Sequence, residues 1–166
     1  MKTKLPISEA EDLAAQLRVI HEGDVWHGPA LRELLGGLSP AQAASRPLPQ
    51  AHSIWELVLH IAAWENVYVQ CLAGAAMGKP AEGEFPPIGN LTPAAWQQAL
   101  ARLDRLHEEL HRAVGALRES ALQQIVPGRP YTVQFMLQNA VRHHVYHAGQ
   151  IALLKKAVVS LERATS

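Results

Sequence analysis

The sequence is short of cysteine, net charge and long hydrophobic runs, and each shortage excludes a class of protein. Cys71 is the single cysteine, which excludes an internal disulfide and fits a reducing compartment. The 15 basic and 15 acidic residues balance, so no strong field draws the chain to nucleic acid or an anionic membrane. No apolar run reaches about 18 residues, and the first residues lack a hydrophobic signal region. We expect a soluble, cytoplasmic protein that binds neither nucleic acid nor membranes.

Histidine, by contrast, is abundant, with nine residues in the chain. His143 and His147 lie in a helical pattern over about 132–158, so their side chains share one face about 6 Å apart along the helix axis. His60 stands in the middle of the apolar stripe of another predicted helix. A buried imidazole costs free energy unless its nitrogens bind a hydrogen-bond partner or a metal. The three histidines are therefore either hydrogen-bonded core residues or a metal site.

Apolar residues at helical spacing predict four amphipathic helices and no convincing strand. The predicted ranges are 8–20, 53–73, 92–117 and 132–158, with short helical turns at 30–35, where Pro29 stands in the first turn, and at 39–44. Sequences of the S-x-x-E type begin the first two helices, and Thr-Pro begins the third. The chain shows no internal repeat. We therefore expect residues 1–166 to form a single all-α domain, a four-helix bundle.

The connection over residues 74–91 is rich in proline and glycine and predicts a long loop. Fully extended, such a loop reaches more than about 50 Å, whereas the second helix is roughly 30 Å long. The loop is therefore long enough to return the chain to the start of the second helix, so that the third helix runs parallel to it. The length permits this arrangement but does not require it.

Three neutral imidazoles are a sufficient ligand set for a zinc-like ion and leave one coordination position for water or substrate. The ion would activate bound water or stabilise a thiolate. Zinc and nickel are favoured, and iron and manganese are also compatible with imidazole ligands. Trp64, Asn139 and Gln150 are pocket candidates beside this site. His144 and Tyr146 turn away from the His143 face and are predicted to flank it.

A rival metal motif lies in the third predicted helix, where His107 and His111 complete an HExxH pattern of the kind found in zinc metallopeptidases. The extended form of that motif is absent, because Val114 and Leu117 occupy its glycine and third histidine positions. His107 lies near the edge of the apolar stripe and His111 lies farther out. We expect this pair not to bind metal.

Four segments taken together resemble the DinB family. They are Trp26-His27-Gly28-Pro29, Ser53-Ile54-Trp55-Glu56-Leu57 with His60 and Trp64-Glu65, Tyr131-Thr132-Val133, and His143-x-x-Tyr146-His147-Ala148-Gly149-Gln150-Ile151. The resemblance covers nearly the whole chain, and the last segment is its most specific part. It implies a four-helix bundle with up-down-down-up connection, a homodimer, and a divalent metal held by His60, His143 and His147.

The resemblance also implies two classes of function. The first is a metal-dependent enzyme acting on a small-molecule substrate, such as an S-transferase that uses a low-molecular-weight thiol as cosubstrate, with a metal-dependent hydrolase as a variant. The second is a metal-binding or stress-associated bundle without turnover, in which the ion ties two helices together. No stretch of the sequence is a thiol-recognition motif, so both classes stay open.

Overall fold

The structure of the chain, a computed structural model, describes residues 7–26 and 28–165, with the side chains of residues 162–165 excepted. Regular structure in this part of the chain is helical, apart from one isolated antiparallel bridge between Ile125 and Thr132. The helices are α1 (Glu9–Glu22), α2 (Leu31–Leu35), α3 (Pro40–Ala44), α4 (Ile54–Leu72), α5 (Pro93–Gly115), α6 (Glu119–Leu122) and α7 (Val133–Thr165). The predicted all-α fold is confirmed.

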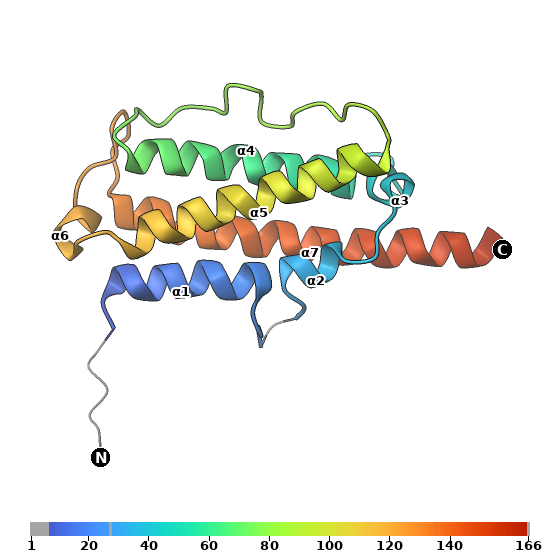
Figure 1. The fold of residues 1–166 in the computed structure, drawn as a ribbon, viewed down its shortest axis with the longest axis horizontal. Helices are drawn as coiled ribbons and strands as arrows, with labels where there is room; N and C mark the ends of the chain where they lie inside the picture. The colour runs from blue at the N-terminus through green and yellow to red at the C-terminus, as the bar shows by residue number, and fades with distance from the viewer. Residues whose placement is uncertain (1–6, 27, 166) are drawn as a thin grey trace, which may run out of the picture.

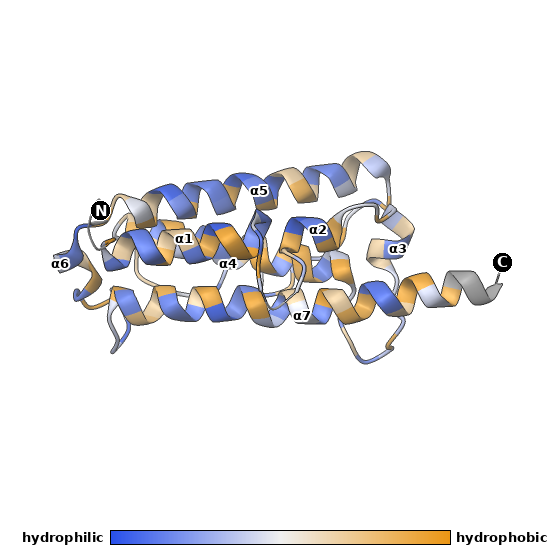
Figure 2. Ribbon diagram, turned by 90° about the horizontal axis from the view of Figure 1, so that it is seen from below, coloured by the Kyte–Doolittle hydropathy of each residue, from blue (hydrophilic) through white to orange (hydrophobic). Residues whose placement is uncertain are grey.

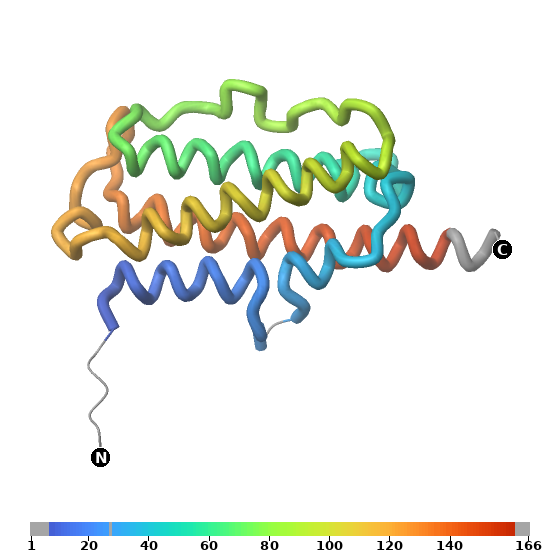
Figure 3. The backbone as a smooth tube through the Cα atoms, in the orientation of Figure 1, coloured from blue at the N-terminus to red at the C-terminus, as the bar shows by residue number. Residues whose placement is uncertain are grey.

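The long helices α1, α4, α5 and α7 form the bundle (Figure 1). Helices α1 and α7 run in one direction, and α4 and α5 run in the other. The loop between α4 and α5 runs back along the length of α4, which makes these two helices parallel (Figure 3). The up-down-down-up connection is therefore confirmed, and the long loop is what makes it sterically possible.

The predicted caps set where the helices begin. The Ser53 hydroxyl accepts a hydrogen bond from the Glu56 backbone N–H at 3.2 Å, and Glu56 Oε2 accepts one from the Ser53 N–H at 2.7 Å. The same reciprocal arrangement begins α1 at Ser8, and the Thr92 side chain caps α5. Gly74 follows α4 with φ +100°, the left-handed conformation expected just after a helix C-terminus.

Three local details differ from the sequence-based expectations. Pro29 precedes the first turn of α2, because the N-cap of that helix is Ala30 in an extended conformation. The neighbouring His27 lies outside the described residues. The short helix α6 falls in a connection that carries no long periodic pattern. Helix α7 continues past 158 to Thr165, since the run 161–164 consists of good helix formers although the apolar stripe has ended.

Apolar side chains pack in two clusters, one toward each end of the bundle. The first includes Leu31, Ile54, Ile61, Trp96, Leu103 and Ile151, and the second includes Leu17, Tyr68, Cys71, Leu110, Leu122 and Leu137. Along α4, α5 and α7, buried histidines and one glutamate occupy the boundary where one cluster gives way to the other. The bundle therefore holds a polar layer between two apolar ones.

Figure 2 shows polar and apolar residues mixed along each long helix, as expected for helices with one buried face. Consistent with this pattern, no helix in the described part of the chain has the length and apolarity needed to cross a bilayer. Cys71 is buried in the second apolar cluster.

Candidate metal centre

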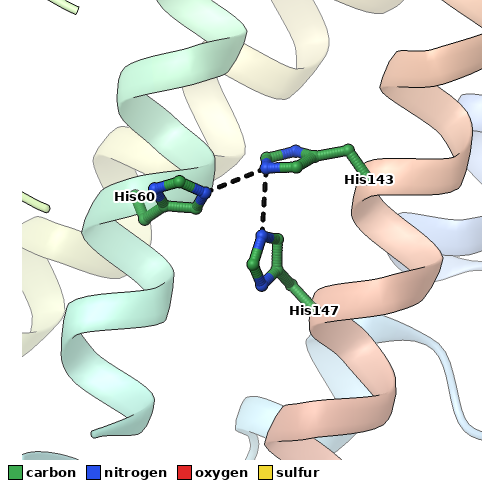
Figure 4. Close-up of side chains that lie close together, drawn as sticks. All are labelled: His60, His143 and His147. Carbon is green, nitrogen blue, oxygen red and sulfur yellow. Dashed lines mark hydrogen bonds between the residues drawn. The ribbon is translucent and has the colours of Figure 1, made fainter. Parts of the chain in front are cut away.

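Three histidines from two helices meet in the polar layer (Figure 4). His143 and His147 lie one turn apart on α7, and His60 faces them from α4. The Nε2 atom of His143 lies 2.9 Å from Nε2 of His60 and 3.0 Å from Nε2 of His147. The structure thus brings together the three histidines that the sequence marked as metal ligands.

The outer nitrogens of two of these rings have acceptors that fix which nitrogen carries the proton. His60 Nδ1 lies 2.5 Å from the carbonyl oxygen of Glu84, and His147 Nδ1 lies 2.6 Å from Gln150 Oε1. Both oxygens can only accept, so each Nδ1 carries the hydrogen. In the neutral rings, Nε2 of His60 and Nε2 of His147 therefore present lone pairs toward His143.

A hydrogen bond alone satisfies this arrangement poorly. His143 Nε2 carries at most one proton and faces two lone pairs, while its buried Nδ1 has no partner among the described residues. A divalent ion about 2.0–2.1 Å from each Nε2 would accept all three lone pairs and would hold the nitrogens roughly 3.3 Å apart. The observed separations of 2.9 and 3.0 Å are close to that spacing. The donor set fits such an ion.

Burial keeps all three imidazoles neutral. Desolvation, together with the nearby imidazoles, lowers the pKa of His143 to about 3 and that of His147 to about 4. Desolvation also lowers the pKa of His60. Metal ions bind the neutral form of histidine, so protons compete little for these nitrogens near neutral pH.

The long α4–α5 loop closes one side of the triad. The ring of Phe85 stacks on His60 with centroids 4.2 Å apart and on His52 with centroids 3.6 Å apart. Glu84, the preceding loop residue, supplies the carbonyl that holds His60. These contacts were not predicted, because no local pattern in a proline-rich loop tells where it packs.

A cavity of about 360 Å³ is lined in part by Gln150, the residue that bonds to His147, although none of the three histidines lines it. Its polar walls include His52 and Gln150, and its apolar walls include Leu57, Leu153 and Leu154. Gln150 bonds to His147, and His52 is linked to His60 through the Phe85 ring. The cavity therefore shares its walls with groups that position two of the three ligands.

The other pocket candidates lie at different distances from the triad. The half-buried Trp64 ring meets the His143 ring edge-on, with centroids 6.4 Å apart. Asn139 donates a hydrogen bond of 2.8 Å to a carbonyl of its own helix, that of Phe135. Tyr146 is 64% exposed, with its ring centroid 5.1 Å from that of His147.

His144, the neighbour of His143 on α7, is buried inside the bundle with 1% of its surface exposed. Its Nε2 lies 2.8 Å from Glu65 Oε1, and its Nδ1 lies 2.7 Å from the carbonyl of Ala140. Helix α7 contacts other helices on more than one side, so a residue turned away from the His143 stripe still faces the interior. The burial of His144 was not predicted, because only the face of α7 that carries His143 was expected to be buried.

The two histidines of the HExxH pattern lie in different environments. His107 is buried, and its Nδ1 lies 2.7 Å from Glu65 Oε1. His111 is near the surface, where Arg18 Nε donates to it at 3.3 Å. Glu108 is about half exposed and pairs with Arg18 and Arg112. The described groups that could hold a metal do not include His107 together with His111.

Comparison with known proteins identifies the family but no individual relative. Residues 24–151 match the family model of the DinB superfamily. The matched range contains His60, His143 and His147. No curated protein and no solved structure matches the chain.

Proposed function

The chain belongs to the DinB superfamily, and from this premise we propose that it is a metal-dependent enzyme with one divalent ion on His60, His143 and His147. The observation that carries the proposal is the convergence of three Nε2 atoms from two helices, 2.9 and 3.0 Å apart. Zinc or nickel suits three imidazoles best, and iron or manganese is compatible.

A three-ligand ion supplies Lewis-acid chemistry at its remaining coordination position. The residues of the chain keep its ligands in place: the Glu84 carbonyl holds the His60 ring, and Gln150 holds the His147 ring. Burial keeps these rings uncharged. The protein thus prepares the ligand nitrogens before any ion arrives, which is the role of outer hydrogen bonds in metal sites.

The cavity lined by Gln150 supports a small, largely uncharged substrate. Leucine and alanine side chains form much of its wall, and the polar groups there are the imidazole of His52 and the amides of Gln50 and Gln150. No lysine, arginine or carboxylate lines it. Such a surface suits an apolar body with one hydrogen-bonding group, and offers no counter-charge to an anion.

Among reaction classes, we favour transfer of a low-molecular-weight thiol to an electrophile. The protein's own thiol is unsuited to that role, because Cys71 lies in an apolar cluster and burial raises its pKa. The nucleophile would therefore come from a cosubstrate. Hydrolysis of a small substrate is the variant that needs no thiol.

A bundle without turnover is the alternative. It is favoured by the enclosure of the triad, since His60 is 7% and His147 is 6% exposed and the loop residue Phe85 stacks over His60. In that case the ion would mainly join α4 to α7 and stabilise the fold. In the homodimer that the resemblance implies, each protomer would contain its own three-histidine site, because all three histidines belong to one chain.

Metal analysis by mass spectrometry of the tag-free protein and of His60→Ala tests the metal site. His60→Ala should contain one ion fewer per chain, whereas the control His111→Ala should equal the unsubstituted protein. Equal contents in His60→Ala and the unsubstituted protein would reject the triad as a metal site.

Activity is tested separately by following the loss of a small thiol in the presence of an aryl halide, and the hydrolysis of small esters. The metal-loaded protein should exceed both the metal-free protein and His60→Ala in one of these reactions. If the ion binds but the rates stay equal across a panel of thiols, electrophiles and esters, the bundle without turnover is the correct assignment.

A further inference from the structure

A second buried polar cluster lies beside the triad and joins α4, α5 and α7. It consists of Glu65, His107 and His144. Glu65 Oε1 lies 2.7 Å from His107 Nδ1 and 2.8 Å from His144 Nε2. Glu65 is fully buried, and it is the one acidic side chain buried within the described residues. An interior carboxylate requires positive charge close by.

The hydrogen bonding of His144 requires a proton or a metal ion between its Nε2 and the Glu65 carboxylate. His144 Nδ1 is 2.7 Å from the Ala140 carbonyl, which can only accept, so Nδ1 carries a hydrogen. In a neutral ring the other nitrogen, Nε2, would point a lone pair at the Glu65 carboxylate 2.8 Å away. Two lone pairs at that distance repel. Either a proton held between the ring and the carboxylate or a metal ion must therefore separate them.

A proton leaves the cluster incompletely satisfied. Glu65 Oε2 is buried and has no hydrogen-bond partner in the part of the chain that the structure describes. A protonated His144 donates a hydrogen bond to Glu65 Oε1 and leaves Oε2 without a donor. A metal ion bound by both carboxylate oxygens would use Oε2 as well, because carboxylates bind metals in a bidentate manner as readily as through one oxygen.

We propose that Glu65, His107 and His144 form a second divalent-metal site, which takes a zinc-class ion. Two imidazoles and a carboxylate suit zinc, cobalt or iron rather than calcium or magnesium, which prefer oxygen ligands. Together, the two carboxylate oxygens, His107 Nδ1 and His144 Nε2 provide four donors. Full burial leaves no position for water or substrate, which is the coordination of a structural site. The ion would tie α4, α5 and α7 together.

The two sites are separate. The rings of His143 and His144 are almost perpendicular, at 89°, with centroids 6.0 Å apart. The two ligand sets have no residue in common. With no ligand that bridges them, the two groups correspond to two mononuclear sites. The second site does not depend on the function proposed for the triad.

The test is whether a variant that lacks two of the triad histidines still binds zinc. The variant His60→Ala/His147→Ala is stripped of metal, reloaded with Zn²⁺ and dialysed, and its metal content is measured along with its helical circular dichroism. One ion per chain is expected to remain. Adding Glu65→Gln should weaken Zn²⁺ binding by more than the 10–100-fold that loss of an outer-shell partner costs. Adding His111→Ala instead, on the same helix as His107, should leave it unchanged.

A folded triad variant without bound zinc would overturn the proposal and identify the cluster as an imidazolium–carboxylate pair. So would zinc binding that Glu65→Gln leaves unaltered. If the triad variant does not fold, Co²⁺ titration of the unsubstituted protein and of Glu65→Gln decides, since cobalt bound by nitrogen ligands absorbs visible light. Saturation at one ion fewer per chain in Glu65→Gln than in the unsubstituted protein supports the second site, and equal saturation rejects it. Loss of the triad ion alone would count only against the first site.

Discussion

Two neighbouring residues of α7, His143 and His144, face two buried sites with opposite electrostatics. His143 faces other imidazoles, and burial together with these neighbours lowers its pKa to about 3. Burial alone would also lower the pKa of His144, but its hydrogen bond to Glu65 and the charge of that carboxylate raise it instead. One buried carboxylate therefore reverses the proton affinity of a ring that lies one residue along the helix.

The comparison explains what each site can hold. Without a negative group, the triad offers three neutral nitrogens and repels protons, so an ion that accepts lone pairs is its natural occupant. The Glu65 cluster already carries a negative charge and holds a proton or a metal ion. Substitutions and acidification should therefore affect the two sites differently.

Glu65→Ala should produce the largest loss of stability. It leaves His107 and His144 buried without their shared acceptor, and breaking a buried charge pair from one side costs about 3–5 kcal/mol. Urea unfolding followed by circular dichroism measures the change in unfolding free energy. His60→Ala in the metal-free protein is the matched comparison and should cost less. Equal losses would show that the two sites do not differ electrostatically.

Acidification should destabilise the metal-free protein through the triad. His143 and His147 have folded-state pKa values of about 3 and about 4, below their ordinary value of 6.5. The unfolded chain therefore binds more protons, and stability present above pH 6.5 is lost as the pH falls toward those values. At pH 5 the loss is roughly 2 kcal/mol per histidine. His144 has the opposite sign, because its raised pKa contributes stability below pH 6.5 that is lost as the pH rises.

Urea unfolding at pH 7.5 and pH 5 checks this dependence, with His143→Ala/His147→Ala as the comparison. That variant should lose less stability on acidification than the unsubstituted protein. The same pH dependence in both would mean that other groups cause the loss.

Gln150→Ala should weaken metal binding at the triad without abolishing it. The amide oxygen orients His147 through its Nδ1, and loss of such an outer partner typically costs 10–100-fold in metal affinity, or about 1.4–2.7 kcal/mol. Competition with a chromophoric chelator measures the affinity. Gln70→Ala is the control and should leave the affinity unchanged, since the exposed Gln70 side chain on α4 donates to Asn66 at 3.5 Å.

His111→Ala should have the smallest effect. Its ring accepts from Arg18 near the surface, and surface changes of this kind usually alter stability by less than about 0.5 kcal/mol. Its metal content should match that of the unsubstituted protein, whereas His107→Ala, from the same HExxH pattern, should be clearly destabilised. Similar effects of the two substitutions would indicate that the two histidines of the HExxH pattern act together after all.

Local patterns in the sequence were sufficient for most of the fold. The S-x-x-E sequences at Ser8 and Ser53 begin α1 and α4 as predicted, since a cap depends on residues three positions apart. The pairing of His143 with His147 follows from helical geometry in the same way. The length of the loop allowed α4 and α5 to run parallel but did not require it. The prediction that they do so came from the resemblance to the DinB family.

The helices, their caps and the shared face of His143 and His147 follow from the sequence, because each depends on contacts within a few residues. The packing of the helices, by contrast, places His60 Nε2 2.9 Å from His143 Nε2, and the path of the loop brings the Glu84 carbonyl to the His60 ring. Helix packing also brings Glu65, His107 and His144 together, from three helices. These contacts depend on the register between packed helices and on the path of a long loop. Neither leaves a periodic signal in the chain.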